Sequence, residues 1–338
     1  MAPAKKKARK SAVRARAAPA ASHGSAVAFV YPRGSGSRDK GAVVLDEVDR
    51  KRLEHGEYLN DNLIDLYLER ATAIPAAAGA AKSVVLTSKW WPKVIESEFF
   101  GDGMVRLDGR RAYEAVKRPG WTRNVDIFDQ DLVFVPLNRR GDPGHWSLFV
   151  VVNPGKRPPL SRSPALPIPR PPRFERDGRI ALHVGADDDE GDGDGAAAKP
   201  DPCEPYILAM DSLRTEDPAR ISEYLREVLK CAWTDRKGDD LDGRFELETM
   251  PVFTPFLPKQ ENGFDCGVFV LKFFDLLFNA PLPERATDDD MTFGGRFSKE
   301  LFGTVEVDAK RAELRQLFDA EWDHASPGRR VAWFNEKR

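Results

Sequence analysis

The chain has 338 residues, of which 41% are apolar and 31% charged, and its formal net charge is −2. This length and apolar content suffice for one sizeable core with additional tails. The near-neutral charge excludes a uniformly basic nucleic-acid binder and an acidic solvating chain. An odd set of three cysteines, Cys203, Cys231 and Cys266, is a poor disulfide framework and favours a reducing compartment.

Neither a membrane span nor a secretion signal is expected. No stretch approaches the roughly 20 apolar residues that cross a bilayer. No apolar segment of the signal-peptide type opens the chain.

Residues 1–40 are predicted to form a disordered basic tail. Residues 1–38 contain no Asp or Glu, and their Ala, Ser and Pro content offers too little apolar surface for folding. The Lys and Arg cluster at 5–10 resembles a nuclear-localisation signal, so we expect the nucleus, or nucleus and cytoplasm, as the location. An organellar transit peptide is an alternative interpretation of this acid-poor start, and a solvated tail without an address is another.

A folded domain is expected over 41–322, followed by a C-terminal tail at 323–338. Residues 43–45 predict a short strand, and Asp46 is a helix cap. After residues 58–61 (Tyr-Leu-Asn-Asp), apolar residues recur at helical spacing as far as Leu68. This pattern predicts a helix that is capped by Asn60 or Asp61.

Two adjacent buried strands are predicted next. Residues 131–137 form one apolar run and residues 146–152 a second, with a polar turn at 138–144 between them. His145 stands at the start of the second strand.

The composition then changes over 154–204, first to Pro, Arg and Ser and later to acidic residues with Gly and Ala. Such a segment does not fit inside a compact core. Because apolar sequence resumes at 206–210, it is predicted to be a disordered insertion within the domain. The remaining predicted elements are a helix at 221–233, a strand at 245–253, a buried helix at 266–278 and a helix at 309–322.

Cys266 is the candidate nucleophile. A loop that contains Gly263 delivers it to the first turn of an apolar helix, where unpaired N–H groups and the positive helix end stabilise a thiolate. The thiolate is the reactive form of cysteine. Gly267 would let a substrate backbone pass close to the sulfur. A buried structural cysteine is the alternative interpretation.

Three further residues could supply what acyl transfer needs. His145 is the candidate base, because the other histidines lie in the tails, the insertion or charged segments. Asp211, which ends the run 206–210, would orient its imidazole. Gln260, six positions before Cys266, would bind the oxyanion together with a backbone N–H group. Each signal alone also has a structural explanation, as a packed histidine, a turn cap or a surface glutamine.

Taken together, these residues resemble a known family. His145-Trp146, residues 208–212 (Leu-Ala-Met-Asp-Ser) and residues 260–269 (Gln-Glu-Asn-Gly-Phe-Asp-Cys-Gly-Val-Phe) are similar to motifs of the SUMO/sentrin-specific, or ubiquitin-like-protein-specific, cysteine proteases. That family is related to adenovirus-type proteases. Residues 58–67 and 126–137 resemble its N-terminal signature and the strand before its histidine. The resemblance covers about residues 41–322 apart from the insertion.

The resemblance implies an α+β, papain-like or adenain-like fold, in which a mixed central sheet adjoins a buried helix with the nucleophile at its N-terminus. It implies Cys266, His145 and Asp211 as the catalytic triad and Gln260 in the oxyanion hole. It implies no metal and no organic cofactor.

The resemblance also implies a substrate tunnel. In that family a Trp beside the histidine covers the Gly-Gly tail of the modifier, a role that falls to Trp146. Tyr58 stands where the opposite wall is often a Trp, and Asp61 is the candidate contact with the modifier surface. The long insertion resembles the branch with loop insertions, which is linked to editing of modifier chains.

The expected function is a cysteine protease that removes or matures a ubiquitin-like modifier, foremost SUMO, by cleaving after its C-terminal Gly-Gly. The expected partners are a SUMO-like modifier and its conjugates, with no membrane and no specific nucleic acid, and the chain is expected to be a monomer. A protease for a NEDD- or ubiquitin-type modifier and a non-catalytic modifier-binding scaffold are the alternatives. The complete set of Cys, His, Asp and Gln argues against the scaffold.

Overall fold

The computed structural model describes residues 28–32, 42–75, 77–101, 104–117, 125–139, 144–157, 204–282 and 291–324. These residues form a five-stranded mixed sheet in the order β3–β6–β7–β8–β9 and two two-stranded sheets, β1–β2 and β4–β5. The strands are β1 (Ala28–Tyr31), β2 (Val43–Asp46), β3 (Ser83–Val85), β4 (Glu98–Gly101), β5 (Met104–Leu107), β6 (Leu132–Arg139), β7 (His145–Val152), β8 (Tyr206–Met210) and β9 (Val252–Phe253). The helices are α1 (Glu47–Lys51), α2 (Asp61–Thr72), α3 (Trp90–Ile95), α4 (Gly109–Lys117), α5 (Pro218–Lys237), α6 (Cys266–Leu277) and α7 (Thr304–His324), with a 3-10 turn at Ile127–Asp129.

The middle of the large sheet is antiparallel and its edges are parallel. β6 pairs with β7 along the whole of both strands, so that Arg139 lies opposite His145. β7 pairs with β8 from Leu148 to Val152. The short strands β3 and β9 run parallel to β6 and β8. The predicted α+β class with a mixed central sheet is confirmed.

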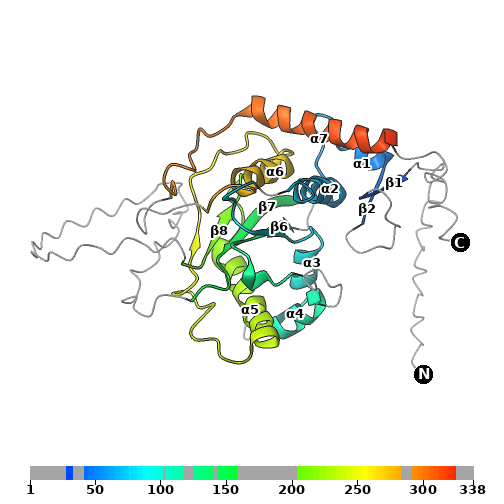
Figure 1. The fold of residues 1–338 in the computed structure, drawn as a ribbon. Coiled ribbons are helices and arrows are strands. Elements are labelled where there is room, and N and C mark those ends of the chain that lie inside the picture. The colour runs from blue at the N-terminus through cyan, green and yellow to red at the C-terminus, as the bar shows by residue number, and fades with distance from the viewer. Residues whose placement is uncertain are drawn as a thin grey trace, which may run out of the picture.

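Helices cover both faces of this sheet. Figure 1 shows α2, α6 and α7 on one side and α3, α4 and α5 on the other. Leu148 and Val150 of β7 belong to the core that includes α6, whereas Phe149 and Val151 belong to the core that includes α5. A strand that is buried on both faces needs apolar side chains at successive positions. The all-apolar run 146–152 therefore follows from the layered architecture.

Two of the predicted helix caps are present, Asp46 at the start of α1 and Asn60 at the start of α2. Asp46 accepts hydrogen bonds from the N–H groups of Val48 and Asp49 at 2.8 and 3.2 Å, and Asp49 accepts one from the N–H of Asp46 at 2.8 Å. This reciprocal pair is a capping box. Asn60, rather than Asp61, caps α2 by accepting from the N–H of Leu63 at 3.2 Å.

The predicted disordered tail at 1–40 is wrong at residues 28–31, which form β1 and pair antiparallel with β2. Phe29 packs edge-on against Phe318 and Trp322 of α7, with ring centroids 5.3 and 5.7 Å apart. Tyr31, on the same face of the strand, is also buried. Burial of these aromatic rings provides the free energy that orders the short segment. Residues 1–27 and 33–41 lie outside the described residues.

The predicted strand at 245–253 is wrong over most of its length. Only Val252–Phe253 pair with β8, as β9. The preceding residues fold into turns, in which Thr249 Oγ1 donates to the Gly243 carbonyl at 2.7 Å. Phe245 is buried and lies 5.9 Å from the Trp233 ring of α5. Phe245 and Met250 of this run are therefore buried by a folded-back turn, whereas Leu247 is exposed.

The other predicted boundaries shift by a few residues. Residues 154–157 of the predicted insertion form a turn after β7. This turn packs tightly, since a Cβ on Gly155 would lie 1.9 Å from the Phe128 carbonyl oxygen. α7 runs to His324, into the predicted C-terminal tail, and β6 extends to Arg139, into the predicted turn. Residues 158–203 and 325–338, which hold most of the insertion and the tail, lie outside the described residues.

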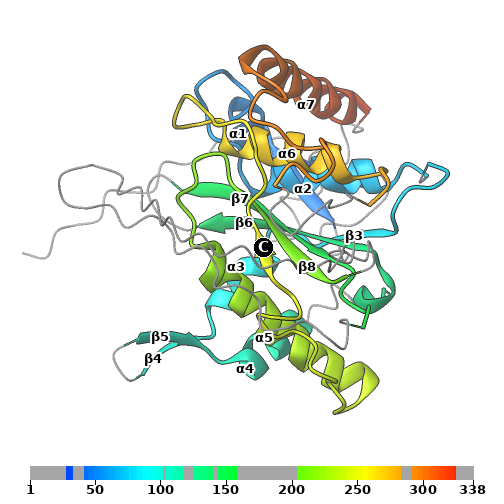
Figure 2. The ribbon, with the colours of Figure 1, turned by 90° about the vertical axis from the view of Figure 1, so that its left-hand side faces the viewer.

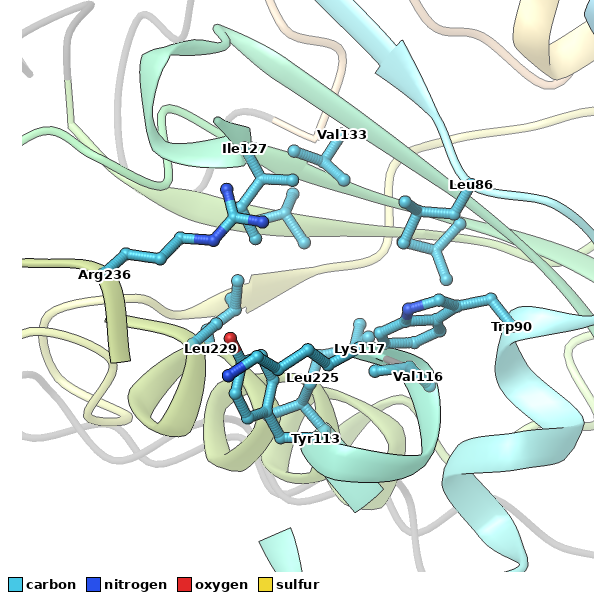
Figure 3. A pocket seen from close by; sticks show the side chains of 14 residues that line it. Leu86, Trp90, Tyr113, Val116, Lys117, Ile127, Val133, Leu225, Leu229 and Arg236 are labelled. Carbon is cyan, nitrogen blue, oxygen red and sulfur yellow. The ribbon is translucent and has the colours of Figure 1, made fainter. Parts of the chain in front are cut away.

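A small apolar cavity of about 40 Å³ lies between the sheet and helices α3, α4 and α5 (Figure 3). Leu86, Trp90, Val133 and Leu229 are among the side chains that line it. Trp90, Val133 and Leu229 belong to the core that includes α5, whereas Cys266 belongs to the core on the opposite face of the sheet. The cavity is therefore separate from the candidate nucleophile.

We predict that Phe29→Ala destabilises the domain by about 3 kcal/mol, because it leaves a hole against Phe318 and Trp322. Phe100→Ala is the matched control, since the residue is 76% exposed and removal of its ring should change the free energy of unfolding little. Urea unfolding of the two variants and the wild type provides the measurement. Equal midpoints for Phe29→Ala and the wild type would show that β1 is not part of the folded domain.

Candidate active site

Cys266 is the first residue of α6, and only 1% of its surface is exposed. The residues before it form a loop that carries the chain from β9 to the start of this buried helix. Asp265 occupies the N-cap position, but its carboxylate makes no capping hydrogen bond to the N–H groups of the described helix. The N-terminal N–H groups of a helix are hydrogen-bond donors with a partial positive charge. The sulfur therefore lies where an anion is stabilised.

His145 and Asp211 form a buried pair at neighbouring strand ends. His145 begins β7 and Asp211 directly follows β8, so the antiparallel pairing of these strands brings the two side chains together. His145 Nε2 lies 2.7 Å from Asp211 Oδ1. The two side chains are 4% and 7% exposed. The distance and the burial indicate a strong hydrogen bond that is shielded from water.

Backbone groups hold the Asp211 carboxylate in place. Its Oδ1 accepts from the N–H of Leu213 at 2.9 Å, and its Oδ2 accepts from the N–H groups of Thr215 and Glu216 at 2.7 and 3.0 Å. The turn that leaves β8 thus wraps around the carboxylate. A carboxylate fixed in this way can orient the imidazole with little freedom of its own.

Two opposing influences set the pKa values of this pair. Burial disfavours the charged imidazole of His145, but its hydrogen bonds with Asp211 and Cys266 outweigh burial and raise its pKa from 6.5 to about 9. Burial likewise disfavours the Asp211 carboxylate, but the hydrogen bonds from His145 and from backbone N–H groups lower its pKa from 3.8 to about 2. Across neutral pH the pair is an imidazolium and a carboxylate.

The thiol of Cys266 interacts with the same imidazole. The hydrogen bond between the two side chains is among the influences that raise the His145 pKa. Since Nε2 faces Asp211, Nδ1 is the nitrogen that remains for the sulfur. A cationic imidazole beside a cysteine stabilises the thiolate. The structure thus brings together the sulfur, the imidazole and the carboxylate that the sequence analysis proposed.

Gln260 lies next to this group, and it is buried. Its Nε2 donates to the Asn262 carbonyl at 2.6 Å, and its Oε1 accepts from Ser212 Oγ at 2.6 Å. Ser212 follows Asp211, so this bond ties the loop before α6 to the end of β8. An amide group has two N–H donors, and the bond to Asn262 uses one of them.

Of the four residues proposed to contact substrate, Trp146 and Gly267 adjoin Leu59. Trp146 is buried, and its indole N–H donates to the Leu59 carbonyl at 2.9 Å. A Cβ on Gly267 would lie 2.9 Å from Leu59 Cβ, which gives this glycine a packing role in addition to the predicted passage for substrate. The half-buried Tyr58 places its hydroxyl 3.5 Å from the position of a Cβ on Gly263. Asp61 accepts from Asn138 Nδ2 at 3.2 Å.

The sequence analysis gave no role to several residues that shape the site. Ser212 and Asn262 hold Gln260, and Arg311 of α7 binds Asp265 Oδ1 at 2.7 Å. Ser212 and Asn262 lie inside the motifs quoted above, so their positions were a usable signal. Arg311 is 46 residues from Asp265 and sits on an ordinary amphipathic helix, which carries no local signal.

Within the described ranges, no group of three or more His, Cys, Asp or Glu side chains could hold a metal ion. In the same part of the chain, no helix is long and apolar enough to cross a membrane. Cys231 and Cys266, the two cysteines that the structure describes, are both free thiols.

This row of groups at a helix start beside a mixed sheet is the arrangement that papain-like thiol proteases use. The model of the Ulp1 protease family, C-terminal catalytic domain, matches residues 57–301. That match spans more than half of the chain, and the chain belongs to this family.

Curated relatives and a solved structure agree with the family. Probable ubiquitin-like-specific protease 2A of Arabidopsis thaliana is 26% identical over 303 residues, which are 86% of this chain and 31% of that protein. Sentrin-specific protease 7 of Mus musculus is 26% identical over 263 residues, or 72% of this chain and 24% of that protein. The chain thus spans less than a third of the length of these relatives. The crystal structure of a de-sumoylating protease has the same fold, with a TM-score of 0.53 at 16% identity over 92% of this chain and 95% of that one.

We predict that Asp211→Asn lowers the free energy of unfolding by about 3 kcal/mol near pH 6, because it leaves a buried imidazole without its anionic partner. The loss depends on pH in a defined direction. Since the pKa of His145 is raised from 6.5 to about 9, the stabilisation is complete below pH 6.5 and disappears as the pH rises through 9. Since the pKa of Asp211 is lowered from 3.8 to about 2, it persists above pH 3.8 and disappears as the pH falls toward 2.

Urea unfolding of wild type and Asp211→Asn between pH 4 and 9.5 measures this difference. Asp235→Asn is the control. Asp235 of α5 pairs with Lys117 of α4 and makes no bond to His145 or Asp211. Its effect should be small and constant between pH 5 and 9. A difference for Asp211→Asn that stays constant from pH 6 to 9.5 would contradict the raised pKa of His145.

Proposed function

We propose that this chain is a cysteine protease that cleaves after the C-terminal Gly-Gly of a ubiquitin-like modifier, foremost SUMO, and so removes or matures it. The observation that carries the proposal is the buried 2.7 Å pair of His145 and Asp211, with the Cys266 thiol hydrogen-bonded to the same imidazole. Membership of the Ulp1 protease family supports it.

The first chemical step forms a thioester. The Cys266 sulfur starts as a thiolate beside the imidazolium of His145 and attacks the carbonyl carbon of the terminal glycine. The C=O electron pair moves to oxygen, which becomes an oxyanion. When the C–N bond breaks, the imidazolium of His145 gives its proton to the leaving amine, which is the lysine Nζ of a conjugate or the peptide nitrogen of a precursor. Asp211 keeps the ring oriented throughout.

The second step releases the modifier. His145 takes a proton from water, and the hydroxide oxygen attacks the thioester carbon. The C–S bond then breaks, and the free carboxyl end of the modifier leaves. The sulfur returns to its starting state beside the imidazolium. Atoms balance without a metal or an organic cofactor, so the residues described above suffice for the reaction.

Gln260 and the start of α6 stabilise the oxyanion in both steps. The second N–H of the Gln260 amide and the backbone N–H of Cys266 are the proposed donors. The 2.6 Å bonds to Ser212 and Asn262 hold the amide in place before substrate arrives. Donors that are fixed in advance stabilise developing charge without reorganisation.

A narrow substrate passage explains the demand for glycine. Tyr58 and Trp146 are the proposed walls on either side of the Gly-Gly tail, and Gly267 lets the tail approach the sulfur. Asp61 is the proposed contact with the folded part of the modifier. The segment 58–61 is tied to the site through Leu59, which receives the indole N–H of Trp146. The names of the relatives, ubiquitin-like-specific and sentrin-specific protease, favour a SUMO-type modifier.

The basic cluster near the N-terminus supports a proposal for the cellular location. We propose a nuclear, or nuclear and cytoplasmic, protein on the basis of the Lys and Arg cluster at 5–10. A monomer suits a protease that binds one modifier at one cleft. No specific nucleic-acid binding is expected.

We predict that a SUMO-type modifier with a C-terminal vinyl sulfone forms a covalent adduct with the wild type and none with Cys266→Ala. The thiolate adds to the probe because the probe places its electrophile where the scissile carbonyl would lie. Mass spectrometry of the adduct is the measurement. Cys231→Ala is the matched control, since Cys231 is the other free thiol that the structure describes and its removal should leave labelling unchanged.

The same experiment with NEDD- and ubiquitin-type probes separates the alternatives. Labelling by one of these and not by the SUMO-type probe would keep the protease and change its modifier. No labelling by any probe would favour the non-catalytic scaffold. Labelling that persists in Cys266→Ala would remove Cys266 as the nucleophile.

We predict that Gln260→Ala lowers kcat by about 10²–10³ with little change in KM, because the lost donor acts on the oxyanion and not on bound substrate. Hydrolysis of a SUMO-type precursor under steady-state conditions measures both constants. Gln316→Ala, at an exposed position on α7, is the control and should match the wild type. A rise in KM at constant kcat would assign Gln260 to substrate binding instead.

A further inference from the structure

Asp265 has an unusual place for a carboxylate. It directly precedes Cys266 and occupies the N-cap position of α6. Aspartate is among the preferred N-cap residues, because its carboxylate accepts hydrogen bonds from the second or third N–H group of the helix. Asp265 accepts no such bond from the described N–H groups of α6. Some other interaction must therefore hold its side chain.

That interaction is a buried ion pair with α7. Asp265 Oδ1 accepts from Arg311 Nη2 at 2.7 Å, and the two side chains are 7% and 6% exposed. The other carboxylate oxygen accepts from Asn262 Nδ2 at 2.8 Å. Both oxygens of Asp265 thus have partners outside α6, and the guanidinium neutralises the charge.

The guanidinium itself is fixed from a second direction. Arg311 Nη1 donates to the carbonyl oxygens of Arg52 and Glu54, both at 3.2 Å. These carbonyls belong to the segment between α1 and Tyr58. Figures 1 and 2 show α7 on the side of α6 that faces away from the sheet. Arg311 of α7 reaches the residue before α6 through its bond to Asp265. Arg311 cannot move without breaking bonds to two separate segments.

A capping Asp265 would oppose the reaction in two ways. It would occupy N–H groups at the start of α6 that otherwise stabilise the thiolate and the oxyanion. It would also place an uncompensated negative charge one residue from the sulfur, in a buried setting where like charges repel strongly. The preference of aspartate for the N-cap position thus conflicts with the use of the same N–H groups by a thiolate or an oxyanion.

We propose that Arg311 is a positioning residue for Cys266: it holds the Asp265 carboxylate away from the start of α6 and neutralises it, which keeps the N–H groups there available to the anions of the reaction. The proposal rests on the proposed function in one respect, namely that Cys266 is the nucleophile. It assigns a role to α7, which lies beyond residues 57–301 that the family model matches.

Other charged or titratable groups lie beside the sulfur or in the segments that adjoin the start of α6. His145 and Asp211 face it from β7 and the end of β8. His55 lies beside Phe264, with ring centroids 5.4 Å apart. The Arg52 side chain donates to the Tyr58 carbonyl at 3.3 Å. A test must therefore compare variants that leave these groups unchanged.

The experiment measures the rate at which iodoacetamide alkylates Cys266 as a function of pH. Cys203 and Cys231 are replaced by Ala in every variant, so that Cys266 is the thiol that reacts. In Arg311→Met the pH midpoint of alkylation should rise by about one unit. At a fixed pH below the midpoint, the variant should then react about tenfold more slowly than the wild type. For turnover of a SUMO-type precursor, kcat should fall about tenfold with KM little changed. Arg315→Met, at an exposed position on α7, is the matched control and should match the wild type.

A double variant distinguishes the proposed effect of Arg311 on Asp265 from a general loss of structure around α7. In Asp265→Ala/Arg311→Met the buried charge and the capping side chain are both absent, so the alkylation midpoint should return close to that of the wild type. A structural role would leave the double variant as slow as Arg311→Met, because α7 would still have lost its bonds to the carbonyls of Arg52 and Glu54. If Arg311→Met does not fold, Arg311→Gln replaces it, which keeps a donor for Asp265 but no charge and should also raise the midpoint.

A wild-type midpoint in Arg311→Met or Arg311→Gln, or no recovery in the double variant, would overturn the inference. The proposed function fails by a different result. Absence of precursor turnover in the wild type, with none of the modifier probes labelling Cys266, would overturn the function and leave the alkylation comparison readable.

Discussion

The hydrogen bond between His145 and Asp211 is the constraint on which the rest of the site depends. It is buried, it is 2.7 Å long, and each partner is fixed at a strand end. The pairing of β7 with β8 sets where the two side chains meet, and three backbone N–H groups keep the carboxylate from turning. Because Asp211 stabilises the cation, the imidazole keeps its charge through neutral pH despite its burial. A thiol beside it then has a permanent cationic partner.

The helix that carries the thiol is positioned from both sides. The sheet packs against one side of α6 through the core that includes Leu148 and Val150. α7 packs on the other side and sends Arg311 to the residue before Cys266. A helix held on only one side could tilt, and a shift of one ångström at its N-terminus is large compared with the tolerance of a nucleophile for its base. The sheet and α7 together therefore fix the start of the helix that carries Cys266.

The sequence alone located the thiol, imidazole and carboxylate of the candidate site better than the residues that hold them in place. His145 and Asp211 could be found because they stand at the ends of buried apolar runs, and Cys266 because it opens one. Partners of these residues were harder to find when they came from distant segments. The ion pair of Asp265 with Arg311 spans 46 residues, and the contact of Phe29 with α7 spans almost the whole chain, so neither leaves a local pattern. The apolar run 245–253 gave the opposite error, since its local pattern predicted a strand. Phe245 instead packs on Trp233 of α5.

Leu59 fixes the position of the proposed substrate walls relative to Cys266. Its carbonyl receives the indole N–H of Trp146, one residue from the base, and its side chain fills the space that a Cβ on Gly267 would need, one residue from the sulfur. The segment that bears Tyr58 and Asp61 therefore cannot shift against β7 or α6 without breaking a hydrogen bond or a close contact. Arg311 holds the same segment further upstream, at the carbonyls of Arg52 and Glu54. The segment 58–61, His145 and Cys266 are thus fixed relative to one another, which is the preorganisation that the proposed cleavage requires.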